Sequence, residues 1–153
     1  MHLDYVGFLV CGSRTVGNYD KNIYNSDPFC SYTNKEHVDL FCDWMGRLTS
    51  RIVETHKKHN SLFTKNNILI IHGQAVGPDD MAAIWARKNQ FNVLAMPAQW
   101  DLFGKSAGYR RNVEMINICD YVFAAYDGHS KGTAHTIKLA KERKKKIKTL
   151  IFD

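Results

Sequence analysis

Hydrophobic residues along this chain follow two patterns, short uninterrupted runs and longer stripes with helical spacing. The short runs lack polar residues at alternate positions, which is typical of strands covered on both faces in a parallel sheet. They predict five strands, at 5–11, 68–71, 92–96, 120–126 and 147–152. The stripes between them predict four helices, at 36–59, 78–90, 109–119 and 132–145.

Alternation of strands with helices implies right-handed β-α-β crossovers and a doubly wound sheet. We therefore predict an α/β, Rossmann-like fold with a mostly parallel sheet of about five strands and helices on both faces. The 153 residues are enough for one such domain and too few for two. The predicted single domain spans residues 1–153.

Segment 15–34 fits neither pattern. It is long for a connection and rich in Asn, Asp, Ser and Tyr. It leaves the end of the first strand, where open α/β sheets bind ligands. We predict a lid that orders over a ligand and stacks Tyr19, Tyr24 or Tyr32 on a base; the alternative is a passive insertion.

The composition excludes few classes of protein, but it bears on cellular location and on metal binding. Apolar residues at 44% and charged residues at 24% are ordinary for a soluble protein, and no run of 18 apolar residues or signal peptide is present. We expect a cytoplasmic protein without membrane contact. Cys11 and Cys119 lie in apolar stretches, which predicts buried, reduced thiols. Cysteines and histidines lack metal-ligand spacing, so we expect a metal-independent site without a cofactor.

The net charge of +6 suits an anionic ligand. Much of the excess lies in the lysine-rich run at 138–148. A solvated helix face is the ordinary explanation of such a run, and nucleic-acid binding is the alternative.

Gly12-Ser13-Arg14 follows the first predicted strand. The glycine would let a ligand approach the backbone, the serine could donate a hydroxyl hydrogen bond, and the arginine could bind phosphate through two nitrogens. An ordinary turn with a solvated arginine is the alternative.

A second glycine turn follows the second strand, with His72-Gly73 at its start. His72 could contact a ligand or transfer a proton, or it could be a satisfied polar residue at a strand end. Asp79 and Asp80 begin the next predicted helix, where they could bind ribose hydroxyls. The alternative is that at least one of them only caps the helix.

Segment 104–112, GKSAGYRRN, brings three cations to a predicted helix start: Lys105, Arg110 and Arg111. A helix N-terminus is a poor place for cations because its dipole is already positive. We therefore expect a negative ligand nearby. Pairing with Asp101 or Glu114 is the alternative.

Ser130-Lys131-Gly132-Thr133 opens the last predicted helix. Hydroxyls and free amides converge at such a start, which favours phosphate binding. The segment is not a Walker A loop, and the chain contains no G-x-G-x-x-G, no G-x-S-x-G and no H-E-x-x-H. The motifs of dehydrogenases, serine hydrolases and zinc proteases are therefore absent from the sequence.

Four segments in this order, VCGSR, IHGQAVGPDDMA, PAQW…GKSAGYRRNVEMI and SKGTA, resemble the SLOG superfamily, in particular its YpsA-like branch. The resemblance covers nearly the whole chain outside 15–34. It implies a Rossmann-like fold that binds nucleotides or molecules derived from them, and a homodimer, because relatives in this superfamily commonly dimerise.

Other relatives, the lonely-guy phosphoribohydrolases, use an arginine in R-K-A-x-M and a glutamate in P-G-G-x-G-T-x-x-E. Arg111 to Met115 resembles the first motif, with Arg111 in the place of the functional arginine. The second motif keeps its G-T, but Thr136 stands where those enzymes carry glutamate. Without that carboxylate, the resemblance favours binding over hydrolysis.

We therefore predict a sensor or sequestering protein for a nucleotide-derived molecule, such as an ADP-ribose-like signal, bound at the carboxyl ends of the strands. The first alternative is an N-glycosidic hydrolase of nucleoside monophosphates, with Arg111 in the catalytic site and an acid from Asp79, Asp80, Asp101, Glu114 or Asp127. The second is a nucleic-acid-binding domain. The predicted ligand-binding residues are Gly12, Ser13, Arg14, His72, Gly73, Asp79, Asp80, Trp100, Lys105, Arg111, Asn112, Ser130, Lys131, Gly132 and Thr133.

Overall fold

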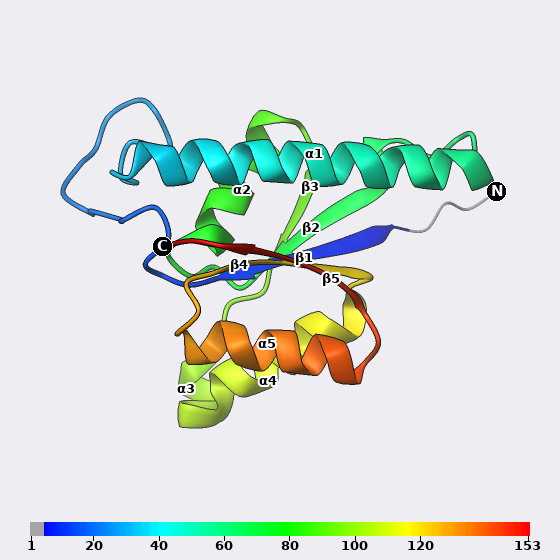
Figure 1. Cartoon of the computed structure of the whole chain (residues 1–153). Coiled ribbons are helices and arrows are strands. Elements are labelled where there is room, and N and C mark those ends of the chain that lie inside the picture. Colours follow the sequence, from blue (N-terminus) through cyan, green and yellow to red (C-terminus); the bar gives the residue numbers. More distant parts are fainter. Residues whose placement is uncertain (1–4) are drawn as a thin grey trace.

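A five-stranded parallel sheet forms the centre of the protein in a computed structural model that describes residues 5–153 (Figure 1). The strands are β1 (Val6–Gly12), β2 (Ile68–His72), β3 (Asn92–Ala95), β4 (Tyr121–Tyr126) and β5 (Lys146–Ile151). The helices are α1 (Lys35–His59), α2 (Pro78–Lys88), α3 (Trp100–Phe103), α4 (Ala107–Ile118) and α5 (Lys131–Glu142), with short 3-10 turns η1 (Lys65–Asn67) and η2 (Gly104–Ser106). The predicted α/β, Rossmann-like fold is confirmed.

Helices cover both faces of the sheet, α1 and α2 on one and α3, α4 and α5 on the other (Figure 1). Successive side chains of β1 point to opposite faces of the sheet and pack against the helices on each face. Phe8 and Val10 belong to the core beneath α1 and α2, whereas Leu9 and Cys11 belong to the core beneath α4 and α5. Full burial of each large apolar side chain contributes about 1.5–3 kcal/mol. The uninterrupted apolar runs of the sequence follow from this two-sided burial.

The strand order β3-β2-β1-β4-β5 reverses direction at β1. The chain builds outward from β1 to β3, then returns and builds outward through β4 to β5. The connections that leave β1 and β4 therefore diverge to opposite faces of the sheet. Open α/β sheets bind ligands in the crevice outside such a switch point, at the carboxyl ends of the strands.

The starts of the predicted helices differ from the sequence prediction by at most two residues, and α2 begins at Pro78 as predicted. Helix α4 begins at Ala107, and the single turn of α3 before it was not predicted. Neither Asp79 nor Asp80 caps α2, so the capping interpretation is wrong. The cap position is Gly77, with a φ of 96° and no side-chain capping bond, and both carboxylates bond elsewhere.

Segment 15–34 is partly built into the core. Val16 and Tyr32 are fully buried and Phe29 nearly so, all in the cluster beneath α1 and α2. Tyr19 packs on Tyr32, with ring centroids 5.2 Å apart. The predicted stacking of Tyr32 on a ligand base is wrong, because no part of this side chain reaches the surface.

None of the helices in residues 5–153 is both long enough and apolar enough to cross a membrane. Cys11 and Cys119 are buried free thiols, as predicted.

Candidate functional site

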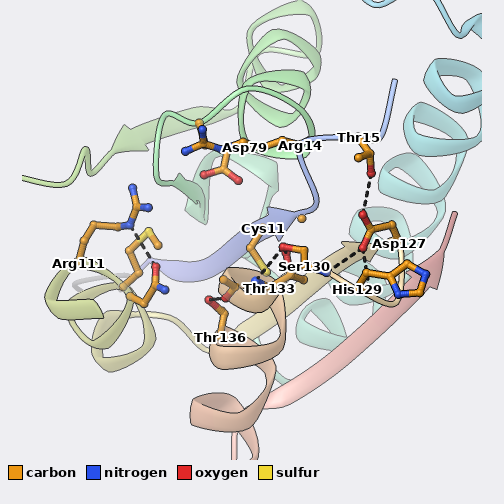
Figure 2. Close-up of a pocket in the computed structure, with 15 residues that line it drawn as sticks. Cys11, Arg14, Thr15, Asp79, Arg111, Asp127, His129, Ser130, Thr133 and Thr136 are labelled. Atoms are coloured by element: carbon orange, nitrogen blue, oxygen red, sulfur yellow. Dashed lines mark hydrogen bonds between the residues drawn. The ribbon is translucent and has the colours of Figure 1, made fainter. Parts of the chain in front are cut away.

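A cavity of about 500 Å³ lies at the carboxyl ends of β1 and β4, at the switch point of the sheet (Figure 2). Helices α2, α4 and α5 and the turns that follow β1, β2 and β4 contribute to its wall. Its lining residues are Cys11, Gly12, Arg14, Thr15, Ala75, Asp79, Arg111, Asn112, Met115, Asp127, His129, Ser130, Gly132, Thr133 and Thr136.

The first turn of α5 forms one end of this cavity. Ser130 caps the helix, and its Oγ accepts a hydrogen bond from the Thr133 amide at 3.4 Å. The amides of Lys131 and Gly132 have no hydrogen-bond partner within residues 5–153. A side chain at Gly132 would meet nothing within 4 Å. Gly132, with one of these free amides at the positive end of the helix dipole, therefore lines the cavity, an arrangement that favours an anion.

Asp127 shapes the turn that leads into α5. Its carboxylate accepts hydrogen bonds from the amides of His129 and Ser130, at 2.8 and 2.9 Å, and from the hydroxyl of Thr15 at 2.8 Å. These bonds, above all that from His129, hold the pKa of Asp127 well below its usual range. The group is therefore a fixed negative charge at the cavity edge. An aspartate directly after a buried strand is the signal that could have added it to the predicted site.

Arg111 crosses from α4 to the carboxyl ends of β2 and β3. Its Nη1 donates to the carbonyls of Gly73 and Met96, at 2.5 and 3.3 Å, and its Nε donates to the Oδ1 of Asn112 at 3.1 Å. It forms no salt bridge within the described residues, so the pairing with Asp101 or Glu114 is not found. Strand-end carbonyls offset part of its charge, and the rest faces the cavity.

Asp79 is the buried acid of the site, with 6% of its surface exposed. Its Oδ2 accepts a hydrogen bond from the Gly73 amide at 2.7 Å. Burial raises the pKa of Asp79 from 3.8 to about 6, although the Gly73 amide and the charge of Arg111 oppose the shift. This carboxyl therefore changes between its protonated and ionised forms close to neutral pH.

A second cavity of about 280 Å³ adjoins the first. The two share Arg14, Ala75 and Arg111 as a common wall. Trp100 lines the second cavity with 56% of its surface exposed. The edge of its indole rests on α4, where a side chain at Gly108 would come within 3.3 Å of it. An aromatic ring supported from behind can stack on a planar ligand group.

The cavities bring together ten of the fifteen predicted ligand-binding residues. Eight line the first cavity: Gly12, Arg14, Asp79, Arg111, Asn112, Ser130, Gly132 and Thr133. Gly73 and Trp100 line the second. Two of the glycines serve the protein rather than a ligand. A side chain at Gly12 would overlap Pro78, and one at Gly73 would overlap Arg111.

The five other predicted residues lie outside both linings. Ser13 is fully buried, and its Oγ accepts a bond from the Asp127 amide at 3.0 Å, so it joins two strand ends instead of meeting a ligand. His72 is buried at the end of β2, with Nδ1 accepting from Gln74 at 3.1 Å. Burial lowers the pKa of His72, which favours the neutral ring. The alternative of a satisfied polar residue at the strand end fits only in part, because the buried Nε2 of His72 has no hydrogen-bond partner within residues 5–153.

Asp80 turns away from the cavity and accepts a hydrogen bond from the Tyr32 hydroxyl at 2.7 Å. The side chains of Lys105 and Lys131 are exposed to solvent and do not line either cavity. The spacing of residues in the sequence did not predict the directions in which these three side chains point.

Only two of the five acids considered for a hydrolase line the main cavity, Asp79 and Asp127. The resemblance to phosphoribohydrolases predicts Thr136 at the position of their glutamate. Thr136 is 2% exposed, and its hydroxyl donates to the Gly132 carbonyl at 3.1 Å. Residues 5–153 contain no group of three or more His, Cys, Asp or Glu side chains placed to hold a metal ion.

The lysine-rich run lies away from this site. It begins at Lys138 within α5 and continues into the edge strand β5, whose first residue is Lys146. Because all strands are parallel, the start of β5 is at the opposite end of the sheet from the cavity. Lysines on an edge strand also hinder pairing with other strands.

Comparison with known proteins finds similarity to a phage protein. The Gene 61 protein of Mycobacterium phage D29 is 34% identical over an alignment of 105 residues, and the match covers 65% of this chain and 82% of the phage protein. The chain belongs to the family of this phage protein. No model of a known protein family matches the chain, and no solved structure matches it. The name of the phage protein states no ligand or activity, so the resemblance to the SLOG superfamily stays a prediction.

Proposed function

We propose that the protein binds a nucleotide or a nucleotide-derived molecule, and that it acts as a sensor or sequestering protein for it. One observation carries the proposal: two cavities at the switch point of the sheet share Arg14 and Arg111. One cavity ends at free helix amides, and the other contains an exposed indole. An elongated ligand with a planar base at one end and phosphate farther along its length matches this arrangement.

Charge favours a phosphate of low or moderate negative charge. Arg14 and Arg111 and the start of α5 attract an anion, whereas Asp127 and ionised Asp79 oppose it. A pyrophosphate bridge with a sugar at each end, as in ADP-ribose, spreads its charge along both cavities. This supports an ADP-ribose-like ligand over a nucleoside triphosphate.

A ligand series tests the proposal. Small molecules released on denaturation of the purified protein are identified by mass spectrometry, and calorimetry then compares ADP-ribose, AMP, ribose 5-phosphate and adenosine. We expect ADP-ribose to bind more tightly than any fragment. If none of the four binds and no nucleotide-derived molecule is released, the proposal is wrong.

Two variants separate the ends of the ligand. Trp100→Ala removes the predicted stacking surface and should weaken ADP-ribose and AMP by about 1–3 kcal/mol, roughly five- to 150-fold in Kd. Ribose 5-phosphate should bind this variant as it binds the wild type. Tyr109→Ala is the matched control, since this ring is also exposed on the same helical layer but lines neither cavity. Equal losses for all ligands in Trp100→Ala would contradict the assigned orientation.

N-glycosidic hydrolysis of nucleoside monophosphates is the second candidate, and Asp79 is the observation that favours it. A carboxyl in the cavity with a pKa near 6 can protonate a leaving base or accept a proton from water. Chromatography of AMP and CMP incubated with the protein decides between the two candidates. We expect no free base above background, because Thr136 replaces the usual glutamate. Base release that Asp79→Asn abolishes would establish the hydrolase instead.

A further inference from the structure

The hydroxyl of Tyr32 lies where segment 15–34 meets the start of α2. It donates a hydrogen bond to Asp80 Oδ2 at 2.7 Å and accepts one from the Gly77 amide at 3.1 Å. Burial and the bond to Asp80 raise the pKa of Tyr32, so the hydroxyl keeps its proton at neutral pH. One buried group thus bonds both to the cap residue of α2 and to a carboxylate in its first turn.

The turn that this hydroxyl holds forms part of the wall of both cavities. This turn, residues 73–80, comprises the connection from β2 to α2 and the first three residues of α2, and it contributes Gly73, Ala75 and Asp79 to the linings. Gly77 adopts a φ of 96°, a region that side chains disfavour, and a Cβ there would come within 2.9 Å of the Ser13 carbonyl. Its buried amide has no hydrogen-bond partner other than Tyr32 within residues 5–153. Without that partner, the amide would lose its bond in a place that water does not reach.

The two neighbouring carboxylates at the start of α2 form hydrogen bonds on different sides of the turn. Asp80 bonds to Tyr32 on the side of segment 15–34, whereas Asp79 bonds to Gly73 on the side of the cavity. The carbonyl of the same Gly73 accepts the short bond from Arg111. Displacement of the turn would therefore move both an acid and an arginine of the site.

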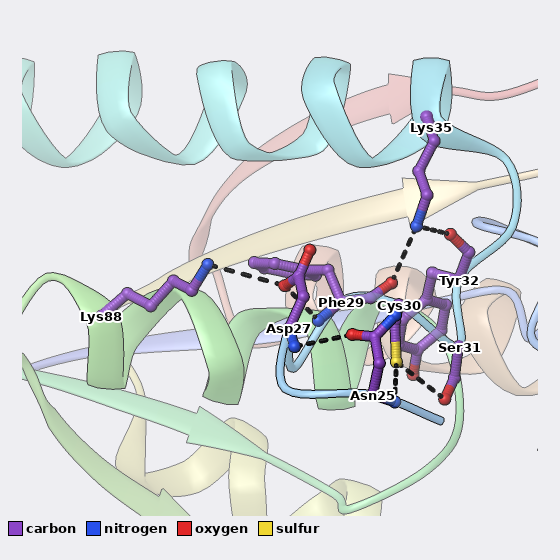
Figure 3. Close-up of polar contacts among 8 residues, drawn as sticks. All are labelled: Asn25, Asp27, Phe29, Cys30, Ser31, Tyr32, Lys35 and Lys88. Carbon is purple, nitrogen blue, oxygen red and sulfur yellow. Dashed lines mark hydrogen bonds and ion pairs between the residues drawn. The ribbon is translucent and has the colours of Figure 1, made fainter. Parts of the chain in front are cut away.

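Segment 15–34 is itself fixed to two helices (Figure 3). Lys35 of α1 donates to the carbonyls of Phe29 and Tyr32, at 3.2 and 2.9 Å. Lys88 of α2 lies 3.8 Å from Asp27 and 5.0 Å from the centre of the Phe29 ring. The backbone on either side of Tyr32 is therefore held against the body of the protein.

We infer that segment 15–34 is a strut, and that Tyr32 is a positioning residue of the site. Its hydroxyl fixes the 73–80 turn so that Asp79 and the arginine-binding carbonyl of Gly73 face the cavity. The consequence for ligand binding rests on the proposed function, whereas the consequence for the turn does not. The strut takes the place of the predicted lid for the part of the segment that contains Phe29 and Tyr32.

Tyr32→Phe tests this inference, because it removes only the hydroxyl and keeps the buried ring. Tyr19→Phe is the matched control: the same change in the same segment, at a hydroxyl that has no hydrogen bond within the described residues. Three quantities are measured in both variants: amide hydrogen exchange, the pKa of the Asp79 carboxyl by carbon NMR, and calorimetric affinity for ADP-ribose.

In Tyr32→Phe we expect exchange at Gly73 and Gly77 to accelerate at least about tenfold more than in the sheet, and the Asp79 pKa to fall toward 3.8 as water reaches it. Affinity for ADP-ribose should fall by about tenfold. Tyr19→Phe should leave all three quantities unchanged. A uniform rise in exchange, or a turn and an Asp79 pKa that match the wild type, would overturn the inference. If the wild type binds no ligand, the proposed function fails, while exchange and the Asp79 pKa still decide whether Tyr32 holds the turn.

Discussion

Asp79→Asn should stabilise the protein at neutral pH, and the gain should shrink as the pH falls. Asparagine has nearly the same shape and can still accept the Gly73 amide bond through its side-chain oxygen. The main change is the loss of the charge, although an NH2 group also replaces one of the oxygens that the Gly73 and Ala75 amides stabilise in ionised Asp79. In the wild type, ionised Asp79 is buried beside the cavity, and the folded state resists its ionisation.

The magnitude follows from the pKa of Asp79, which rises from 3.8 to about 6 on folding. Between these values the folded state binds more protons than the unfolded state, so the free energy of unfolding falls as the pH rises. The full difference is about 2.2 pKa units, or about 3 kcal/mol, reached above about pH 6. At about pH 4.5 only about 1 kcal/mol of it is present.

Urea denaturation at a series of pH values from about 4.5 to 7.5 measures this effect. We expect the stability of Asp79→Asn relative to the wild type to increase by about 2 kcal/mol over the series. Asp39→Asn, the same change at an exposed position of α1, serves as control for the removal of a carboxylate in water. A constant difference between Asp79→Asn and the wild type across the series would refute the argument from burial.

Three further predictions concern the proposed ligand. Arg111→Ala should weaken ADP-ribose binding at least about tenfold, because it removes a charge-assisted contact worth about 1.5–3 kcal/mol; a lower melting temperature with unchanged calorimetric affinity would make this arginine purely structural. Gly132→Asp should abolish binding by placing a carboxylate in the open space at the start of α5, and a folded variant with wild-type affinity would contradict the phosphate position. Affinity for ADP-ribose should rise as the pH falls through about 6, because protonation of Asp79 removes a repulsive charge; Asp79→Asn should lose this dependence in the same titration.

The sequence by itself determined the fold class. Uninterrupted apolar runs separated by helical stripes require a sheet covered on both faces, and β1 shows why, since Phe8 and Leu9 enter different cores. The glycine turns after β1, β2 and β4 could also be placed at one edge of the sheet, because parallel strands share their carboxyl ends. Arg14 and Ser130 were found in this way, whereas Arg111 was found from the cluster of cations at the predicted helix start in 104–112.

Only the tertiary structure decided which way each side chain in those turns points. Asp79 and Asp80 are adjacent in sequence, yet one faces the cavity and the other bonds to Tyr32. Ser13 lies beside Arg14, but it is buried against Asp127. The direction of a side chain in a turn depends on partners far away along the chain, and the spacing of residues in the sequence does not identify those partners. For the same reason segment 15–34, which has no periodicity, gave no sign that Tyr32 is a core residue that supports the site.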